Sequence, residues 1–468
     1  MRVDYFFEPC VKYYGLAIQR VQKVVELGVG TADGLNLTEG SSIHVNLNTR
    51  GSARADDPRA TFAIPFDASR DIESKMVIIV PTKNEPVDRL ISVIGGIPSS
   101  VLVILISNSS RTSGDDKYKQ EVDALREHCL KAGNRPALAI HQRDPGAGEA
   151  FEAVGAPEMT DGDHRIRNGK GEGMLLGVAL AAMCPERQYV GFVDSDNIIP
   201  GAIDEYVRAY ALGFYMHREE PDVMVRIKWG SKPKPVRNRL EPSDGRSSRI
   251  VNKWFNRMFS LLPNASSAGN AAGLMQTGNA GEHAMTMSLA LKLNWAGGYA
   301  IEPYQIMCLL FMAVASAYRP NGVNGVNGLA NGRSHRHTHQ PGHFSAKVVQ
   351  IETTNPHIHR ATDDEHIRGM ILEGLGCMYH RLPSPPSAHS RAANGHNADF
   401  ETQFRSEMLA FMEQNDLGRT VPPAPRVSKS LESLDLRKMH SIMLQSCRSL
   451  EVIGPCRLVP SRSQNGRA

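Results

Sequence analysis

Short apolar runs separated by amphipathic segments constrain the fold of this chain more than any other feature of its sequence. The run at residues 76–80 precedes an amphipathic segment at 87–94, and further apolar runs cover residues 101–106, 137–140, 189–192, 223–227 and 347–351. Continuous apolar strands that alternate with helices are typical of a parallel sheet covered on both faces. We therefore predict an α/β fold with a Rossmann-like, mostly parallel sheet and helices on both faces.

Helical periodicity predicts the remaining elements of this layered core. We expect helices at residues 116–131, 174–183, 202–212, 249–261, 282–293, 303–317 and 363–375. The alternation of strands and helices spans residues 75–380, and residues 1–74 form an N-terminal extension. The predicted core domain therefore covers about two thirds of the chain.

Two segments of low complexity divide the rest of the chain. An insertion at residues 320–342, rich in Asn-Gly and histidine, interrupts the core domain and is predicted to be flexible. A linker rich in proline and serine covers residues 381–398. We expect residues 399–468 to form a C-terminal tail with helices at 401–413 and 429–444 and a disordered end.

Charge, cysteine usage and hydropathy exclude several classes of protein. A net charge of +4 over 468 residues is too small to indicate nucleic-acid binding. The seven cysteines are never spaced Cys-x-x-Cys, which argues against structural zinc or a disulfide framework and fits a reducing compartment. The first residues lack the apolar core of a signal peptide, and the longest apolar run, Ile306–Tyr318, is too short to cross a bilayer. We expect a cytoplasmic protein with no membrane or nucleic-acid partner.

Two aspartates follow the apolar run at 189–192, in the sequence Val193-Asp194-Ser195-Asp196. Side chains two positions apart on an extended backbone point the same way, so Asp194 and Asp196 can share one hard cation. Such a cation can hold a diphosphate, and strand ends are where ligands bind in open α/β sheets. Asp-x-Asp also occurs in many turns, so the neighbouring segments decide its meaning.

Two further segments are candidates for binding a nucleotide at the same edge of the sheet. Glu85 follows the first predicted strand and can accept hydrogen bonds from ribose hydroxyls, or it is a turn residue favoured by the helix dipole. Lys170 lies in the glycine-rich segment 168–173 and could reach a base or a phosphate. This segment is neither a Walker A loop nor a dinucleotide fingerprint, because its residues and spacings match neither pattern.

Three features downstream complete the set of candidates. His357 and His359 follow the last predicted strand, where a histidine could complete the coordination of an ion held by Asp196. The segment Thr277–Gly281 precedes a predicted helix and could cradle a phosphate on its hydroxyl and backbone N–H groups. Residues 226–239 carry six cations in fourteen positions, which suits a small, multiply charged acid or a solvated basic loop.

Together these segments resemble a mannosyl-3-phosphoglycerate synthase. The resemblance rests on residues 81–85, 169–174, 193–196, 277–284 and 355–357, which occur in the family's order over residues 75–380. Members of this family are glycosyltransferases that transfer mannose from GDP-mannose to 3-phosphoglycerate with retention of configuration. The resemblance implies the glycosyltransferase A-type fold, with a helical C-terminal extension added in this chain.

The resemblance also implies a role for each matching residue. The implied nucleotide-sugar contacts are Pro81, Glu85, Lys170, Gly171, Asp194 and Ser195. The implied acceptor contacts are Thr277, Gly278, Asn279, Ala280 and Gly281, and the charge of the basic segment adds Arg226 and Lys232 as predicted acceptor contacts. Asp194 and Asp196 are the implied catalytic residues, and Asp196 with His357 is expected to ligate a divalent cation, Mg²⁺ or Mn²⁺. His357 is favoured over His359 because it directly follows Asn355-Pro356.

Two other functions fit parts of this pattern. A sugar-nucleotide pyrophosphorylase also uses carboxylate-bound magnesium, but residues 82–85 do not offer the glycine-rich basic loop that such an enzyme needs after its first strand. A catalytically silent nucleotide-sugar-binding protein is disfavoured by the intact metal-type residues. Glu282 and Glu302 lie in suggestive segments, but neither is clearly placed as a nucleophile. A homodimer is one assembly that the sequence leaves open.

Overall fold

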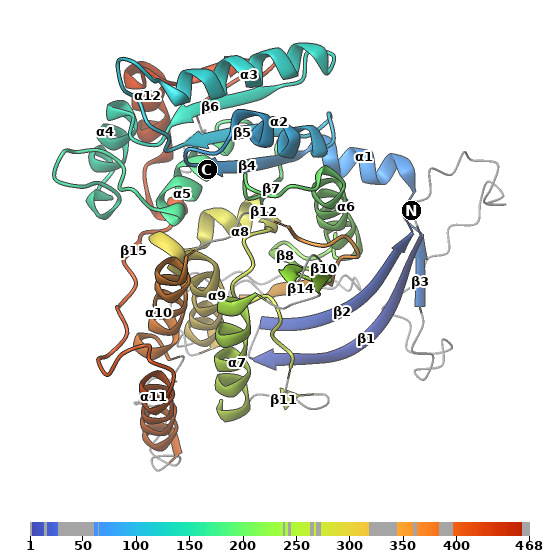
Figure 1. The fold of residues 1–468 in the computed structure, drawn as a ribbon, viewed down its shortest axis with the longest axis vertical. Helices are drawn as coiled ribbons and strands as arrows, with labels where there is room; N and C mark the ends of the chain where they lie inside the picture. The colour runs from blue at the N-terminus through green and yellow to red at the C-terminus, as the bar shows by residue number, and fades with distance from the viewer. Residues whose placement is uncertain are drawn as a thin grey trace, which may run out of the picture.

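The computed structural model describes residues 2–13, 16–26, 60–63, 65–236, 239–241, 245–262, 266–267, 273–317, 344–358, 363–382 and 396–460. These residues build a 12-stranded sheet that runs through the molecule (Figure 1). Its strands lie in the order β11 (Ser266–Ser267), β1 (Arg2–Tyr13), β2 (Leu16–Glu26), β14 (Ala346–Glu352), β8 (Val223–Lys228), β12 (His283–Thr286), β7 (Tyr189–Phe192), β4 (Met76–Thr82), β5 (Leu102–Ser107), β6 (Ala137–His141) and β16 (Glu451–Ile453), and β3 (Ala60–Ala63) pairs with β1. The predicted insertion at 320–342 and most of the predicted linker lie outside the described residues.

The sheet is mostly parallel, as the sequence predicts. Strands β7, β4, β5 and β6 are successive parallel neighbours, and so are β2, β14 and β8. Strand β12 pairs antiparallel with both β7 and β8 and so joins these two groups. Of the strands described here, β1, β12 and β16 run against the common direction. The carboxyl ends of the two parallel groups therefore meet at one edge of the sheet.

Two hydrophobic cores, one on each face of the sheet, hold the layers together. Alternate residues of β4 point to opposite cores: Val77 and Ile79 into one, Ile78 and Val80 into the other. This alternation explains why the strand is apolar at successive positions. The sequence therefore indicates a strand buried on both faces, which the structure confirms.

The helices are divided between the two faces (Figure 1). One core is covered by α2 (Val87–Gly96), α3 (Lys117–Lys131) and α6 (Pro200–Met216), next to α1 (Phe66–Ser74). The other is covered by α4 (Pro145–Ala153), α5 (Lys170–Ala181), α7 (Arg246–Leu261), α8 (Met287–Lys292), α9 (Ile301–Ala317), α10 (Asp364–His380), α11 (His396–Gln414) and α12 (Leu436–Ser446). The stretch Gly298–Ser316 is long and apolar enough to cross a membrane by length and composition, but 72% of its most apolar window is buried inside the molecule, as expected of a core helix.

One predicted helix is wrong, and its replacement shapes the site. Residues 282–293 were expected to form a single helix, but residues 283–286 form strand β12 and only Met287–Lys292 are helical. The short segment fits between β7 and β8 and pairs with both, and such tertiary pairing overrides a local helical preference. Because β12 is antiparallel to its neighbours, its first residues lie at their carboxyl ends.

The C-terminal segment returns to the core of the fold. Strand β15 (Val427–Ser428) pairs with β13 (Trp295–Ala296), α12 packs on α4, and β16 extends the sheet beyond β6. The buried Asp144 carboxylate fixes this segment by accepting hydrogen bonds from the backbone N–H groups of Arg448 and Ser449, at 3.0 and 2.7 Å. Residues 445–460, for which the sequence indicated disorder, are therefore part of the folded structure.

We expect the attachment of this segment to weaken in acid. His440 on α12 is fully buried, and burial lowers its pKa to about 4 from an ordinary value of 6.5. Between these values the unfolded chain binds a proton that the folded chain excludes, so stability rises with pH through this window and is lost as the pH falls. The loss is on the order of 3 kcal/mol. Urea unfolding at pH 7 and 4.5 should show a smaller difference for His440→Leu than for the wild type, and equal differences would contradict this prediction.

Candidate active site

The candidate site lies where the carboxyl ends of the parallel strands meet. Asp194 and Asp196 follow β7, Trp229 follows β8, and His357 follows β14. Glu282 precedes β12, which runs the other way, so its side chain reaches the same edge between β7 and β8. The structure therefore brings together segments that are more than 150 residues apart in the sequence.

Lys170, the first residue of α5, lies between two carboxylates, those of Asp194 and Glu302. Its Nζ lies 2.7 and 3.0 Å from the two carboxylate oxygens of Asp194 and 2.8 Å from Glu302 at the start of α9. Burial acts to lower the pKa of Lys170, but the Asp194 and Glu302 carboxylates outweigh it and hold that pKa well above its ordinary value. Lys170 is therefore charged, and its ammonium group pairs with two carboxylates of the protein itself.

Glu282 is a functional candidate that the sequence analysis did not promote. Its side chain is fully buried, one oxygen accepts a hydrogen bond from Trp229 Nε1 at 2.9 Å, and the other oxygen has no hydrogen-bond partner among the residues that the structure describes. Burial and the nearby Asp194 raise the pKa of Glu282 to about 8, against the opposing effect of Lys232. A buried carboxyl with an unpartnered oxygen beside a cleft is a frequent feature of functional sites. Because residues 282–293 were predicted to form a helix, the place of Glu282 at the sheet edge was not predicted.

His357 is held in one orientation by the residues around it. Its ring stacks on Trp229, with centroids 4.6 Å apart at an angle of 29°. Its Nδ1 lies 3.2 Å from both Asn197 Nδ2 and the Tyr206 hydroxyl, and 4.0 Å from Glu282. Asn197 directly follows Asp196, so this contact brings the Asp-x-Asp segment and the histidine together. His359, the alternative ligand, lies outside the described residues.

The residues present fit a cation that is shared with a bound substrate. No group of three or more His, Cys, Asp or Glu side chains converges as a ready-made metal cluster within the described part of the chain. Asp196 and His357 would therefore supply two ligands. Mg²⁺ and similar ions are commonly held by one or two carboxylates together with substrate phosphates. The second carboxylate oxygen of Glu282, 4.0 Å from His357 Nδ1, adds a further possible oxygen ligand to the same region.

The glycine-rich segment is explained by packing inside the protein. A Cβ added at Gly171 would lie 2.0 Å from the carbonyl oxygen of Ala296, and one added at Gly173 would lie 2.7 Å from Gln142. These glycines therefore allow α5 to approach its neighbours closely. Glu172 accepts hydrogen bonds from Gly298 N–H and from Arg426, at 2.9 and 2.8 Å, and so ties the segment to the C-terminal part of the chain.

The other predicted nucleotide contacts lie at the ends of β4 and β7. Glu85 is 3% exposed and lies 3.5 Å from Arg89 in the first turn of α2. The preceding Asn84 adopts a left-handed conformation (φ 56°) and is held by Ser109 Oγ, which accepts from its N–H at 2.7 Å. Pro81 lies within β4, and Ser195 is buried between the two aspartates.

The structure places two predicted acceptor contacts inside the protein. Arg226 is fully buried, and its guanidinium donates to the carbonyl oxygen of Thr277 at 2.9 Å and to Gln305 at 3.0 Å. The Thr277 hydroxyl donates to Gln350 at 2.8 Å. The helix that was expected to follow this segment is replaced by β12, so the predicted cradle at a helix N-terminus is wrong. The two side chains hold the segment in place instead.

The rest of this segment runs from the candidate site toward a cavity. At one end Gly281 lies against the Asp-x-Asp segment, where an added Cβ would be 2.4 Å from Asp194 Oδ2. At the other end α7 holds the backbone, since Asn252 Oδ1 accepts from Gly278 N–H at 2.7 Å. Asn279 and Ala280 lie buried between these ends. The segment thus connects the Asp-x-Asp segment to Met275 and Gln276, which line the cavity.

This cavity is basic. It has a volume of about 370 Å³ and is lined by Lys228, Trp229, Lys232, Gly245, Ser248, Arg249, Asn252, Lys253, Asn256, Met275 and Gln276. Lys232 Nζ lies 3.7 Å from the centroid of the Trp229 ring. The same ring stacks on His357 and donates a hydrogen bond to Glu282. Burial lowers the pKa of Lys232, while the Glu282, Asp194 and Asp196 carboxylates act to raise it. A cavity with four cationic side chains therefore adjoins the candidate metal residues.

A comparison with protein families identifies the family of this chain. The family model for mannosyl-3-phosphoglycerate synthase matches residues 11–443. The chain belongs to this family. The mannosyl-3-phosphoglycerate synthase of Pyrococcus furiosus is 39% identical over 332 residues, which cover 71% of this chain and 78% of that protein. The mannosyl-3-phosphoglycerate synthase of Aeropyrum pernix is 32% identical over 327 residues, or 69% of this chain and 76% of that protein.

Solved structures with a similar arrangement are more distant. The glucosyl-3-phosphoglycerate synthase of Mycobacterium tuberculosis, in complex with phosphoglyceric acid, is 16% identical with a TM-score of 0.42, over 70% of this chain and 88% of that chain. The same enzyme in complex with Mn²⁺ and UDP-glucose is 15% identical with a TM-score of 0.41, over 70% of this chain and 86% of that chain.

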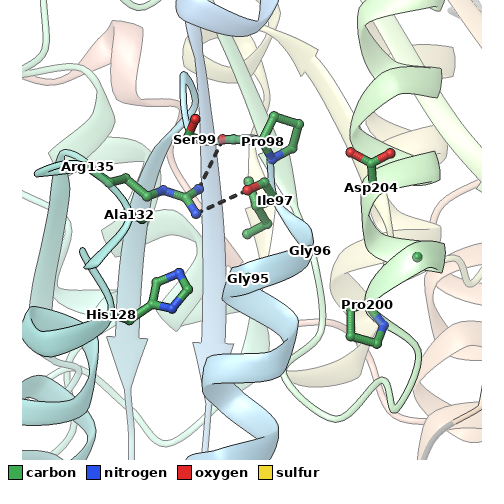
Figure 2. Close-up of a pocket in the computed structure, with 11 residues that line it drawn as sticks. Gly95, Gly96, Ile97, Pro98, Ser99, His128, Ala132, Arg135, Pro200 and Asp204 are labelled. Atoms are coloured by element: carbon green, nitrogen blue, oxygen red, sulfur yellow. Dashed lines mark hydrogen bonds between the residues drawn. The ribbon is translucent and has the colours of Figure 1, made fainter. Parts of the chain in front are cut away.

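A second cavity is formed by a different set of residues. It has a volume of about 430 Å³, and none of the residues lining it is a predicted site residue (Figure 2). Arg135 at its wall donates hydrogen bonds to the carbonyl oxygens of Ile94, Ile97, Pro98 and Val101. The guanidinium therefore caps the C-terminal end of α2, where unpaired carbonyls and the helix dipole favour a cation.

Proposed function

We propose that this protein transfers mannose from GDP-mannose to 3-phosphoglycerate, with retention of configuration, in a reaction that depends on a divalent cation. The observation that carries this proposal is the position of Asp194, Asp196 and His357 at one sheet edge, next to a basic cavity. Membership of the mannosyl-3-phosphoglycerate synthase family and the names of the related proteins support the mannosyl group and 3-phosphoglycerate, and GDP as the carrier follows from the family resemblance.

The donor half of the site consists of the strand ends of β4, β7 and β14. Asp196 and His357 would hold the divalent cation, and Glu85 would accept hydrogen bonds from the ribose. The ring nitrogen of His357 left for a metal would be Nε2, because Nδ1 already lies 3.2 Å from both the Tyr206 hydroxyl and Asn197 Nδ2. A divalent cation held by these residues would supply positive charge to the departing diphosphate.

The acceptor half consists of the basic cavity and the segment Thr277–Gly281. Lys232, Arg249 and Lys253 match the carboxylate and phosphate of 3-phosphoglycerate in charge, and the backbone of residues 278–281 directs the acceptor hydroxyl toward the Asp-x-Asp segment. The hydroxyl attacks the anomeric carbon from the face that GDP leaves, the bond from that carbon to the diphosphate breaks, and the hydroxyl proton leaves with GDP. Lys170 is charged and paired with carboxylates, and it holds Asp194 in place during this exchange.

The proposal is tested by a reaction with purified full-length protein. GDP-mannose, 3-phosphoglycerate and Mg²⁺ should give mannosyl-3-phosphoglycerate and GDP in mass spectra, and omission of the metal should stop the reaction. A panel with UDP-glucose and GDP-glucose measures donor preference. Absence of product with all donors from folded protein would reject the proposal. Release of pyrophosphate from GTP and mannose 1-phosphate would favour a pyrophosphorylase, and GDP-mannose binding without turnover would favour a silent binding protein.

The acceptor cavity has its own test on α7. Arg249→Ala should raise the KM for 3-phosphoglycerate by about tenfold, with kcat and the KM for GDP-mannose unchanged. The reason is that the variant loses a charged contact to the acceptor that is equally strong in the bound ground state and in the transition state. Arg246→Ala is the matched control, since Arg246 lies one turn earlier and pairs with Asp364 outside the cavity. An equal KM in both variants would show that the acceptor binds elsewhere.

Two expectations from the sequence stay predictions. The six cysteines whose side chains the structure describes are free thiols, which fits the cytoplasmic location that we propose. Assembly into a homodimer can be measured by light scattering of the purified protein.

A further inference from the structure

We infer that Glu205 is a positioning residue that fixes the loop carrying His357 and thereby the geometry of the metal site. This inference rests on the proposed function, in which His357 is a metal ligand. Glu205 lies on α6 and is fully buried. Nothing in its sequence context marks it, because an acid within an amphipathic helix is ordinary.

The Glu205 carboxylate accepts hydrogen bonds from both residues that precede Pro356. One oxygen accepts from the backbone N–H and hydroxyl of Thr354, at 2.7 and 2.9 Å. The other accepts from the backbone N–H and side-chain amide of Asn355, both at 2.9 Å. A single buried side chain thus satisfies four donors of one loop, and hydrogen bonds to a charged acceptor are the stronger kind.

The remaining anchors of this loop lie on either side of these contacts. Thr353 N–H donates to the carbonyl oxygen of Lys228 at 3.0 Å, and His357 N–H donates to the carbonyl oxygen of Ser231 at 2.9 Å. Between these points the carboxylate holds the middle of the loop. The residue after Glu205 on the same helix, Tyr206, lies 3.2 Å from the His357 ring. Helix α6 therefore fixes both the backbone and the ring of the histidine.

A carboxylate is needed here because all four groups that face it are donors. Glutamine in place of Glu205 would offer one accepting oxygen and turn an NH₂ group toward two N–H donors. The loop would then have to move to satisfy those donors, and His357 would move with it. Metal affinity is sensitive to such outer contacts, which typically change it by about 10- to 100-fold.

The decisive experiment measures Mn²⁺ binding by electron paramagnetic resonance in the presence of GDP. Glu205→Gln should bind Mn²⁺ about 10- to 100-fold more weakly than the wild type. Saturating Mn²⁺ should restore much of kcat, and the KM for 3-phosphoglycerate should not change. Asp144→Asn is the matched control, since Asp144 is also buried and accepts hydrogen bonds from Gly146, Arg448 and Ser449 away from the site. It should lower stability and leave Mn²⁺ affinity unchanged.

Mn²⁺ affinity within twofold of the wild type in folded Glu205→Gln would overturn the inference. If that variant does not fold, Asn355→Ala decides, because it removes one donor to the same carboxylate: weaker Mn²⁺ binding supports the inference and unchanged binding overturns it. His357→Ala separates this result from the proposed function. If His357→Ala keeps its Mn²⁺ affinity, the metal role of His357 fails; if only His357→Ala loses affinity, the positioning role of Glu205 alone fails.

Discussion

Asp196→Ala is expected to abolish sugar transfer, with kcat falling by about three orders of magnitude. Asp196 follows β7 at the sheet edge and is the carboxylate that we assign to the cation, so its loss leaves the departing diphosphate without charge compensation. The residue is partly exposed and lies after the strand, so the free energy of unfolding should change by only about 1 kcal/mol. Product formation and urea unfolding measure the two effects separately.

Two companion variants sharpen this result. Asp196→Asn keeps the size of the side chain and removes its charge, so it should be nearly as inactive as the alanine variant. Asp204→Ala removes an aspartate that pairs with Arg208 on α6, and it should stay active. Substantial turnover by Asp196→Ala would show that this carboxylate does not hold the cation.

Lys170→Met is expected to destroy activity and also to lower stability by about 3–5 kcal/mol. Lys170 lies between the Asp194 and Glu302 carboxylates, and Glu302 is only 4% exposed. Removal of the cation leaves a buried charge without its partner, and Asp194 loses the contact that fixes it. Thermal or urea unfolding gives the stability loss, and the transferase assay gives the loss of turnover.

A second substitution distinguishes these two effects of Lys170. Lys170→Met combined with Glu302→Gln removes both the cation and the buried charge, so much of the stability should return. Activity should not return, because Asp194 still lacks its partner. Recovery of both stability and turnover in the double variant would show that Lys170 acts only as a structural counter-ion.

Patterns of apolar residues predict most of the fold because they follow directly from burial. Strands such as β4 and β5 are apolar at successive positions since both faces of the sheet are covered, and α3 begins at the residue after Asp116, whose side chain caps it. Strands without a continuous apolar run are harder to predict. Residues 283–286 form β12 because β7 and β8 pair with them from both sides, and no local pattern shows that pairing.

The candidate site was predicted in part, for a related reason. Asp194 and His357 lie in loops that follow strands, and Lys170 begins a helix, so the alternation of elements places them at one edge. Arg226 was misplaced because a cationic residue near a basic segment suggests a ligand contact, whereas this one is buried against Gln305. Glu282 lies in a suggestive segment, but a helix was expected from this residue onward, so its position at the sheet edge beside β12 was not predicted. Long-range contacts decide such positions, and the sequence does not display them.

The most direct test of the proposed metal site is anomalous X-ray diffraction from crystals grown with Mn²⁺ and GDP. We expect a manganese peak within bonding distance of an Asp196 carboxylate oxygen and a His357 ring nitrogen, with the remaining positions filled by diphosphate oxygens and water. A manganese peak elsewhere, with neither Asp196 nor His357 among its ligands, would contradict the proposed site.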